Sequence, residues 1–308
     1  QAMSAIGQLK EALNLLNAVE KMEFGSAELM LTKASIFSQL RDHKQAIKYF
    51  NEALRLVEGE EDRDEIYLDL AMEYQALRDF NGALKVLKEA IRINPSNEGA
   101  IYEIAYCYDQ LGNFKKAIKC YSDFIDENPY SFTAWYNLGN AYSKLEDYEQ
   151  AIDAYGYCIV INEDFGPVYF NLGNAYMGQD DFQQAIDAFQ KCMDLDGEDP
   201  MAFCYMGECF EQLGDLNSAE FYYRRSLDLA PLLPDAWLGL GIVEDLKGNT
   251  QEGITLILKA SELDPDNSGI FHVLAGAYEK VEQIEDAIYY FDKSLKLDST
   301  DEDCLRGF

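Results

Sequence analysis

Histidine and cysteine, the side chains that most often act as bases, nucleophiles or metal ligands, are few and scattered in this chain. The two histidines, His43 and His272, lie in opposite halves of the sequence, and neither has a cysteine nearby. The seven cysteines include no Cys-x-x-Cys pair, so neither a zinc site nor a disulfide framework is expected. Aspartate and glutamate are numerous, but most of them are expected to lie in water on the outside of helices. The residues therefore predict a protein that is not an enzyme and that binds no cofactor and no metal ion.

The charge of the chain restricts the class of partner. It carries 25 basic and 56 acidic side chains, a formal net charge of −31. Nucleic-acid binding depends on lysine and arginine replacing counterions, so this charge argues against a nucleic-acid partner, and it disfavours an anionic membrane surface. A protein or peptide of basic or mixed charge would be attracted instead. The alternative is that the charge only keeps a large surface soluble.

The sequence also carries signals of location. No apolar stretch is long enough to span a membrane, and the first residues lack the basic and apolar segments of a signal peptide. Because free cysteines persist in reducing compartments, we expect a cytoplasmic protein.

A period of 34 residues organises the chain. A small residue recurs inside segments such as QAIKYF, KAIKCY and QAIDAF, and from Ala83 to Ala287 it returns at every 34th position. The interval from Ala46 to Ala83 is 37 residues, which indicates a three-residue insertion near 58–64. Such regular self-similarity indicates an array of structural repeats.

Within each period, apolar residues follow two stripes with helical spacing, separated by a turn. In the segment 132–165, Trp135 and Tyr142 belong to the first stripe and Tyr155 belongs to the second. The small residue Gly139 is expected to let the two helices approach closely. One helix pair cannot bury both of its faces, so each pair must pack on the next. Four cysteines occupy small-residue positions and are expected in the core: Cys107, Cys158, Cys192 and Cys209.

These residues resemble a known family. The pattern W-x2-L-G-x2-Y, followed by the recurring alanine and a closing proline, is similar to the tetratricopeptide repeat. The segment TAWYNLGNAYSKLEDYEQAIDAYGYCIVINED follows that pattern closely. The resemblance implies an all-α fold: a right-handed superhelical solenoid of antiparallel helix pairs, in an array of the bacterial type. It also implies that the first helix of each pair lines a concave groove that binds other proteins or peptides.

The period predicts where each repeat begins and ends. Residues 1–26 are expected to be the second helix of a partial repeat, and 302–308 the start of a truncated helix, so the chain is expected to be part of a longer array. The repeat 234–267 has Glu244 and Gly253 where tyrosine and alanine recur, and glycine costs about 1 kcal/mol in a helix, so low local stability is expected there. The eight predicted repeats are 27–60, 64–97, 98–131, 132–165, 166–199, 200–233, 234–267 and 268–301.

The resemblance further implies that the fifth, sixth and ninth residues of each repeat face the groove. Aromatic rings at the fifth position of three successive repeats would anchor a peptide, although rings there also serve packing. Asparagine amides at the sixth and ninth positions would donate to and accept from a bound backbone. The fifth position also places Cys204 in the groove. The predicted ligand-binding residues are Tyr102, Glu103, Tyr136, Asn137, Asn140, Phe170, Asn171 and Asn174.

Acidic residues outnumber basic ones at the groove positions, which disfavours a carboxylate ligand and favours a basic or mixed one. The leading hypothesis is therefore a non-enzymatic scaffold that binds a basic or extended segment in an acidic, aromatic groove. Two alternatives stay open: a substrate-recruiting arm of a larger enzyme such as a glycosyltransferase, and a structural module that self-associates through exposed terminal helices. The acidic groove positions include Glu65, Asp69, Asp109, Glu208, Glu211 and Asp235.

Overall fold

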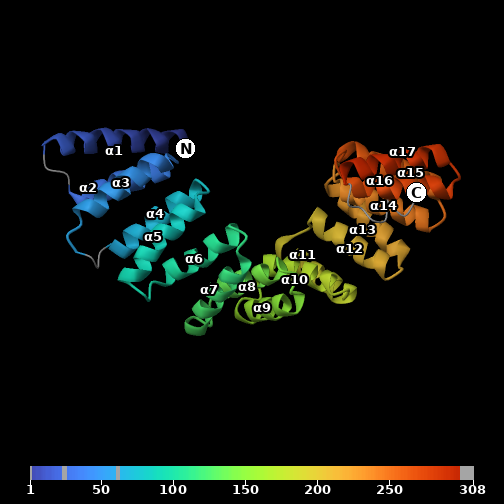
Figure 1. Cartoon of the computed structure of the whole chain (residues 1–308), viewed down its shortest axis with the longest axis horizontal. Coiled ribbons are helices and arrows are strands. Elements are labelled where there is room, and N and C mark those ends of the chain that lie inside the picture. Colours follow the sequence, from blue (N-terminus) through green and yellow to red (C-terminus); the bar gives the residue numbers. More distant parts are fainter. Residues whose placement is uncertain (1, 23–25, 60–62, 299–308) are drawn as a thin grey trace. The chain divides into compact units, whose positions relative to one another are not determined.

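All regular structure in the part of the chain that the computed structural model describes, residues 2–22, 26–59 and 63–298, is helical (Figure 1). The helices group into two compact units, residues 1–161 and 162–308. The first unit holds α1 (Ala2–Met22), α2 (Ala27–Gln39), α3 (His43–Leu56), α4 (Asp64–Ala76), α5 (Phe80–Ile93), α6 (Glu98–Gln110), α7 (Phe114–Glu127), α8 (Phe132–Ser143) and α9 (Tyr148–Ile161). The second unit holds α10 (Gly166–Gly178), α11 (Phe182–Asp196), α12 (Pro200–Gln212), α13 (Leu216–Leu229), α14 (Pro234–Leu246), α15 (Thr250–Leu263), α16 (Ser268–Lys280) and α17 (Ile284–Leu297). The predicted all-α class is confirmed.

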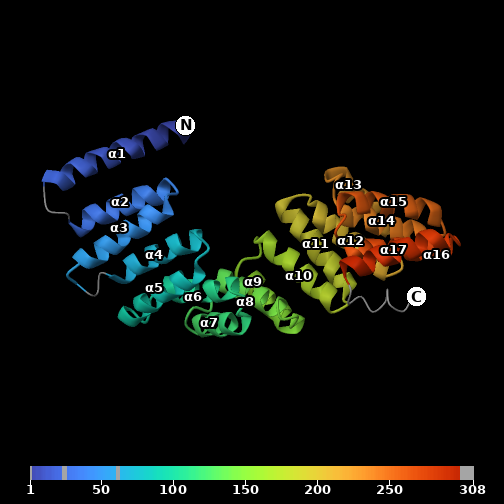
Figure 2. The same ribbon diagram turned by 45° about the horizontal axis from the view of Figure 1, so that its top comes forward.

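Within each unit the helices stack as pairs in sequence order (Figure 2). The two helices of a pair pack against each other, as α4 does with α5, and the second helix of a pair packs on the first helix of the next pair. First helices of successive pairs also touch, as α6 does with α8 and α12 does with α14. We call the surface formed by α2, α4, α6 and α8, or by α10, α12, α14 and α16, the first-helix face. The surface formed by the second helices is the second-helix face.

The turn inside each helix pair has a fixed backbone conformation. The second or third residue after the first helix adopts a positive φ, the left-handed conformation that commonly ends a helix. In several pairs an aspartate follows and caps the second helix; the Asp79 carboxylate, for example, accepts a hydrogen bond from the backbone N–H of Gly82 at 2.9 Å. The left-handed residues are Arg41, Arg78, Gly112, Glu146, Asp180, Gly214, Gly248 and Glu282.

Glycine lets a large side chain of the second helix lie directly on the backbone of the first. A Cβ at Gly139 would lie 2.4 Å from Cε1 of Tyr155, and one at Gly173 would lie 2.6 Å from Cε1 of Phe189. Tyr155 is 1% exposed and Phe189 is fully buried. The close approach predicted at Gly139 is confirmed, and the four cysteines expected in the core are buried.

The repeat 234–267 compensates for its two unusual residues. Gly253 faces Gly241, and a Cβ at 253 would lie 2.7 Å from the Gly241 carbonyl oxygen, so the backbones of α14 and α15 nearly touch. Glu244 is 4% exposed and accepts a hydrogen bond from the side-chain amide of Asn249 at 2.9 Å. Arg224 lies 3.9 Å from its other carboxylate oxygen. The lower stability expected of this repeat stays a prediction.

The repeat boundaries also stay a prediction. Within residues 1–26 the structure describes one helix, α1, which packs on α2; that this helix is the second helix of a partial repeat stays a prediction. The truncated helix expected at 302–308 lies outside the described part of the chain, as do residues 60–62 of the insertion expected near 58–64.

Candidate functional site

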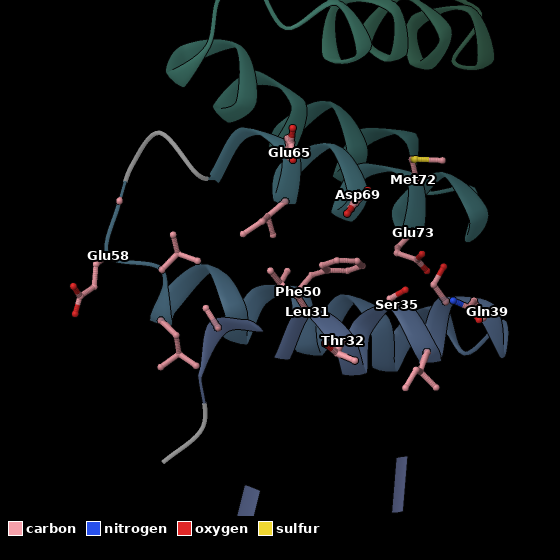
Figure 3. A pocket seen from close by; sticks show the side chains of 17 residues that line it. Leu31, Thr32, Ser35, Gln39, Phe50, Glu58, Glu65, Asp69, Met72 and Glu73 are labelled. Carbon is pink, nitrogen blue, oxygen red and sulfur yellow. The ribbon is translucent and has the colours of Figure 1, made fainter. Parts of the chain in front are cut away.

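A pocket of about 980 Å³ opens on the first-helix face between α2, the end of α3 and α4 (Figure 3). The connection from α3 to α4 spans residues 57–63, whereas the corresponding connections before α6 and α8 span only 94–97 and 128–131. This extra length matches the insertion read from the 37-residue interval. Where the shorter connections occur, the first helices α4 and α6 pack against each other. The pocket therefore lies where the regular repeat is interrupted.

The pocket has an apolar floor and an acidic wall. Leu31, Ile36 and Phe50 contribute to the floor. Glu65 and Asp69 stand one helical turn apart on α4, and Figure 3 shows them on the helix that faces Ser35 and Gln39 of α2. A surface of this kind suits a ligand that combines an aliphatic part with a positive charge.

The acidic residues of α4 differ in whether their carboxylates already have a hydrogen-bond or ion-pair partner within the protein. The helix carries four acidic residues and no basic residue. Asp64 accepts hydrogen bonds from the side-chain amides of Asn94 and Asn97, and the Glu73 carboxylate lies 2.8 Å from Nδ1 of His43. His43, the first residue of α3, thus reaches across to α4.

Glu65 and Asp69 have no ion-pair partner among the described residues. Although Asp69 is exposed, partial shielding of its carboxyl from water raises its pKa above the usual range, and the neighbouring carboxylates of Glu65 and Glu73 raise it further. The pocket thus concentrates negative charge that no basic side chain of the described residues pairs with. A cationic ligand would lower this electrostatic cost.

The predicted ligand-binding residues of α6 and α8 partly serve to join neighbouring repeats. The Asn137 amide donates a hydrogen bond to the Tyr102 hydroxyl at 2.5 Å, linking α8 to α6. Glu103 accepts a hydrogen bond from the Gln75 amide of α4 at 2.7 Å. Burial raises the pKa of the Tyr102 hydroxyl. These side chains join neighbouring first helices, and their polar groups already have partners.

Asn140 and Tyr136 surround a buried ring. The Tyr155 hydroxyl donates a hydrogen bond to Oδ1 of Asn140 at 2.8 Å, and the ring centroids of Tyr136 and Tyr155 are 6.2 Å apart. Burial raises the pKa of Tyr155 well above the usual value. The oxygen of Asn140 therefore helps to hold the interior of its own repeat.

The other predicted residues belong to the second unit. Phe170 packs against Phe189 and Tyr205, with ring centroids 5.6 and 5.8 Å away. Asn171 and Asn174 are half-buried on the same helix. Asn174 makes no hydrogen bond through its amide within residues 63–298. The ladder from Tyr102 through Tyr136 to Phe170 runs from one unit into the other and stays a prediction.

The second unit has its own acidic group on the first-helix face. Burial raises the pKa of Glu208, and the carboxylate of Asp235 adds to this effect. Burial also raises the pKa of Glu211, although the Tyr223 hydroxyl, which donates to it at 3.0 Å, partly offsets the rise. Negative charge at these positions was predicted; Glu208 and Asp235 are exposed, and Glu211 is half-buried.

The expectation that Cys204 faces the groove is wrong. The side chain is 4% exposed and packs in a cluster with Tyr223 and Leu240. Burial raises the pKa of this thiol to about 12. The reason is that α12 turns this residue toward α14, its neighbour on the first-helix face.

Two asparagines at the same repeat position are expected to respond differently to alanine. Asn140→Ala removes the nearer partner of the Tyr155 hydroxyl, at 2.8 Å, and leaves only the Ser143 hydroxyl at 3.2 Å, so we expect the free energy of unfolding to fall by about 1–2 kcal/mol. Asn174→Ala removes an amide without such a bond, so we expect a change below about 0.5 kcal/mol. Thermal and urea unfolding of the two variants measure the difference. Equal losses would contradict the role given to Asn140.

Tetratricopeptide-repeat models match most of the chain, at residues 25–96, 74–129, 132–165, 167–199 and 210–268. The chain belongs to the tetratricopeptide-repeat family. Helix pairs joined by tight turns, with small residues against large rings, are what such repeats require. A search of curated protein sequences found no significant match.

Solved structures share the fold of this repeat protein. A tetratricopeptide repeat protein from Parabacteroides merdae is 15% identical, with a TM-score of 0.67, over 80% of this chain and 97% of its own. The MamA protein is 25% identical, with a TM-score of 0.52, over 54% of this chain and 91% of its own. MamA 41-end from Desulfovibrio magneticus RS-1 is 23% identical, with a TM-score of 0.53, over 55% and 95%.

The family and the fold make this repeat protein a scaffold for protein interactions, since tetratricopeptide repeats typically serve as non-catalytic binding modules. Among the helices that the structure describes, none combines the length and hydrophobicity needed to cross a bilayer. Within the same residues, no three acidic, histidine or cysteine side chains gather in a way that could hold a metal ion.

Proposed function

We propose that the first-helix face of the first unit binds an extended protein segment of basic or mixed charge. The pocket between α2 and α4 is the main anchor, and the half-buried surface around Tyr102, Glu103 and Asn137 continues the binding face along the array. The observation that carries the proposal is the pair Glu65 and Asp69, two carboxylates without a basic partner in the described residues, above an apolar floor. A lysine or arginine would neutralise them while its aliphatic part, or a neighbouring apolar residue, contacts Leu31 and Phe50.

The acidic group around Glu208 and Asp235 gives the second unit a similar preference. A cytoplasmic location, where such segments would be met, is part of the same proposal. A carboxylate-bearing ligand is disfavoured at both groups, because neighbouring carboxylates already raise the pKa of Asp69 in one group and of Glu208 in the other. The proposal therefore concerns the chemistry of the ligand, basic and extended, rather than its identity.

The test compares two labelled peptides of equal length, one alternating arginine with leucine and one alternating glutamate with leucine. We expect the basic peptide to bind the full chain, and its affinity to fall at least tenfold between about 50 and 500 mM salt, because partly exposed charges are screened. Fluorescence anisotropy measures both affinities. Binding of the acidic peptide with equal or greater affinity would overturn the proposal.

A further inference from the structure

In the second unit, rings near the start of first helices are covered by positive charges from the second helix of the same pair. In each case the cation lies over the ring, where attraction to the ring's π-electrons is favourable. The pairs are Arg225 over Phe203 at 5.6 Å, Lys259 over Trp237 at 3.4 Å and Lys293 over Phe271 at 3.9 Å, measured to the ring centroid.

The last helix pair of the first unit departs from this arrangement. Tyr157 precedes Arg225, Lys259 and Lys293 by whole multiples of 34 residues, so it occupies the place of the cation. Its ring stacks on Trp135 with centroids 4.5 Å apart and an interplanar angle of 25°. Tyr157 is 56% exposed. An aromatic surface is therefore open to solvent where three helix pairs of the second unit present a positive charge.

A cavity of about 370 Å³ lies beside this stack, between α7 and α9. Its lining includes three aromatic side chains, Trp135, Tyr142 and Tyr157, and two carboxylates, Asp126 and Asp153. Neither carboxylate has an ion-pair or hydrogen-bond partner among the described residues. The Trp135 ring is held in place by a hydrogen bond from Nε1 to the carbonyl oxygen of Pro129 at 2.9 Å. The cavity is thus a preformed combination of aromatic surface and negative charge.

We propose that this cavity is a second binding site, which takes a lysine or arginine side chain from another protein. The cation lies against the rings of Trp135, Tyr142 and Tyr157 while Asp126 and Asp153 supply the opposite charge. The three cation–ring pairs of the second unit illustrate the interaction within the same molecule. The site is built from α7, α8 and α9 on the second-helix face, so it is separate from the pocket between α2 and α4. It allows the chain to hold two partners at once.

The test uses the indole N–H signals of the full chain in nuclear magnetic resonance. The chain has two tryptophans, Trp135 and Trp237, and the variant Trp237→Phe assigns their signals. The probe is Nα-acetyl-arginine methylamide, and its control is the uncharged isostere Nα-acetyl-citrulline methylamide. We expect the arginine probe to shift the Trp135 signal in a saturable way, while the citrulline probe binds at least tenfold more weakly. The Trp237 ring, already covered by Lys259, should respond little to either probe.

Two variants distinguish the proposed site from non-specific attraction to an acidic protein. Tyr157→Lys should supply an internal cation, as in the second unit, and weaken binding of the arginine probe at least tenfold. The double variant Asp126→Asn and Asp153→Asn should weaken it by a similar factor without touching the aromatic stack. Equal shifts with the two probes, or unchanged affinity in either variant, would overturn the proposal. Because these variants lie outside the pocket between α2 and α4, the result is independent of the proposed function.

Discussion

Replacing Gly253 with alanine is expected to reduce the stability of the α14–α15 pair by about 1–2 kcal/mol, although alanine is the usual residue at this repeat position. Alanine alone would favour the helix by about 1 kcal/mol. However, its Cβ would lie 2.7 Å from the Gly241 carbonyl oxygen and 3.2 Å from the backbone nitrogen of Asp245. Backbone atoms cannot turn aside as a flexible side chain can, so the two helices would have to separate. Hydrogen exchange of the amides in α14 and α15 measures the free energy of local opening.

Gly276 provides a matched control in the same unit. It lies inside α16, and no heavy atom would come within 4 Å of a Cβ there. Gly276→Ala should therefore raise stability by up to about 1 kcal/mol, the full gain in helix propensity. If Gly253→Ala stabilised its helix pair as much as Gly276→Ala does, the close approach of α14 and α15 would be refuted.

Neutralising two carboxylates of the first-unit pocket should weaken ligand binding and stabilise the fold at the same time. For the double variant Glu65→Gln and Asp69→Asn we expect the affinity for the alternating arginine–leucine peptide to fall at least tenfold, since the attraction between opposite charges is lost. The melting temperature at neutral pH should rise. A loss of binding caused by damage to the fold would lower it instead.

The sign of the stability change follows from the pKa of Asp69. Burial and the neighbouring carboxylates raise this pKa in the folded state, so the folded protein holds the proton more tightly than the unfolded chain does. Stability therefore falls as the pH rises from the unfolded-state pKa through the folded-state pKa, and the whole loss is present at neutral pH. The double variant removes this loss, so its advantage over the wild type should disappear in acid. Melting temperatures measured between about pH 3 and pH 7 test this dependence.

The control removes the same amount of charge elsewhere in the unit. Asp123 and Glu149 are exposed on the second helices α7 and α9. The double variant Asp123→Asn and Glu149→Gln should change the affinity for the basic peptide by less than about threefold, because it alters only the distant field. Equal losses in both double variants would show that net charge, and not the pocket, determines binding.

The sequence period was sufficient to predict the helix pairs and their closest contacts. Small residues such as Gly139 had to face large ones such as Tyr155, because a 34-residue repeat leaves each helix the same neighbours every time. The acidic character of the first-helix face was also readable, since it depends only on register. The three-residue insertion was visible, but the pocket that accompanies it was not, because its volume depends on how α4 packs after the longer connection.

The sequence also did not reveal which side chains contact each other. Tyr102 and Asn137 were predicted to bind a ligand, but nothing in the sequence indicated that they bond to each other across two repeats. Cys204 was assigned to the groove by register alone, whereas contacts from the next repeat bury it. Gly253 looked like a defect in an alanine position until its partner Gly241 was located. Each of these depends on contacts between residues that a single repeat does not contain.

The cation–ring pairs of the second unit affect what happens when one of its repeats is moved into another repeat array. Lys259 and Trp237 lie in one helix pair, so a segment such as 234–267 would bring its own cover for the exposed ring into any array that received it. If the segment 132–165 were transferred instead, it would keep the Trp135–Tyr157 stack. It would lose Asp126 of the cavity, which belongs to the preceding repeat. Repeats of the second unit should thus keep their cation–ring pairs when they are moved into another array. The proposed binding of a cation by the last helix pair of the first unit depends on two adjoining repeats, so it would be lost if only one of them were moved.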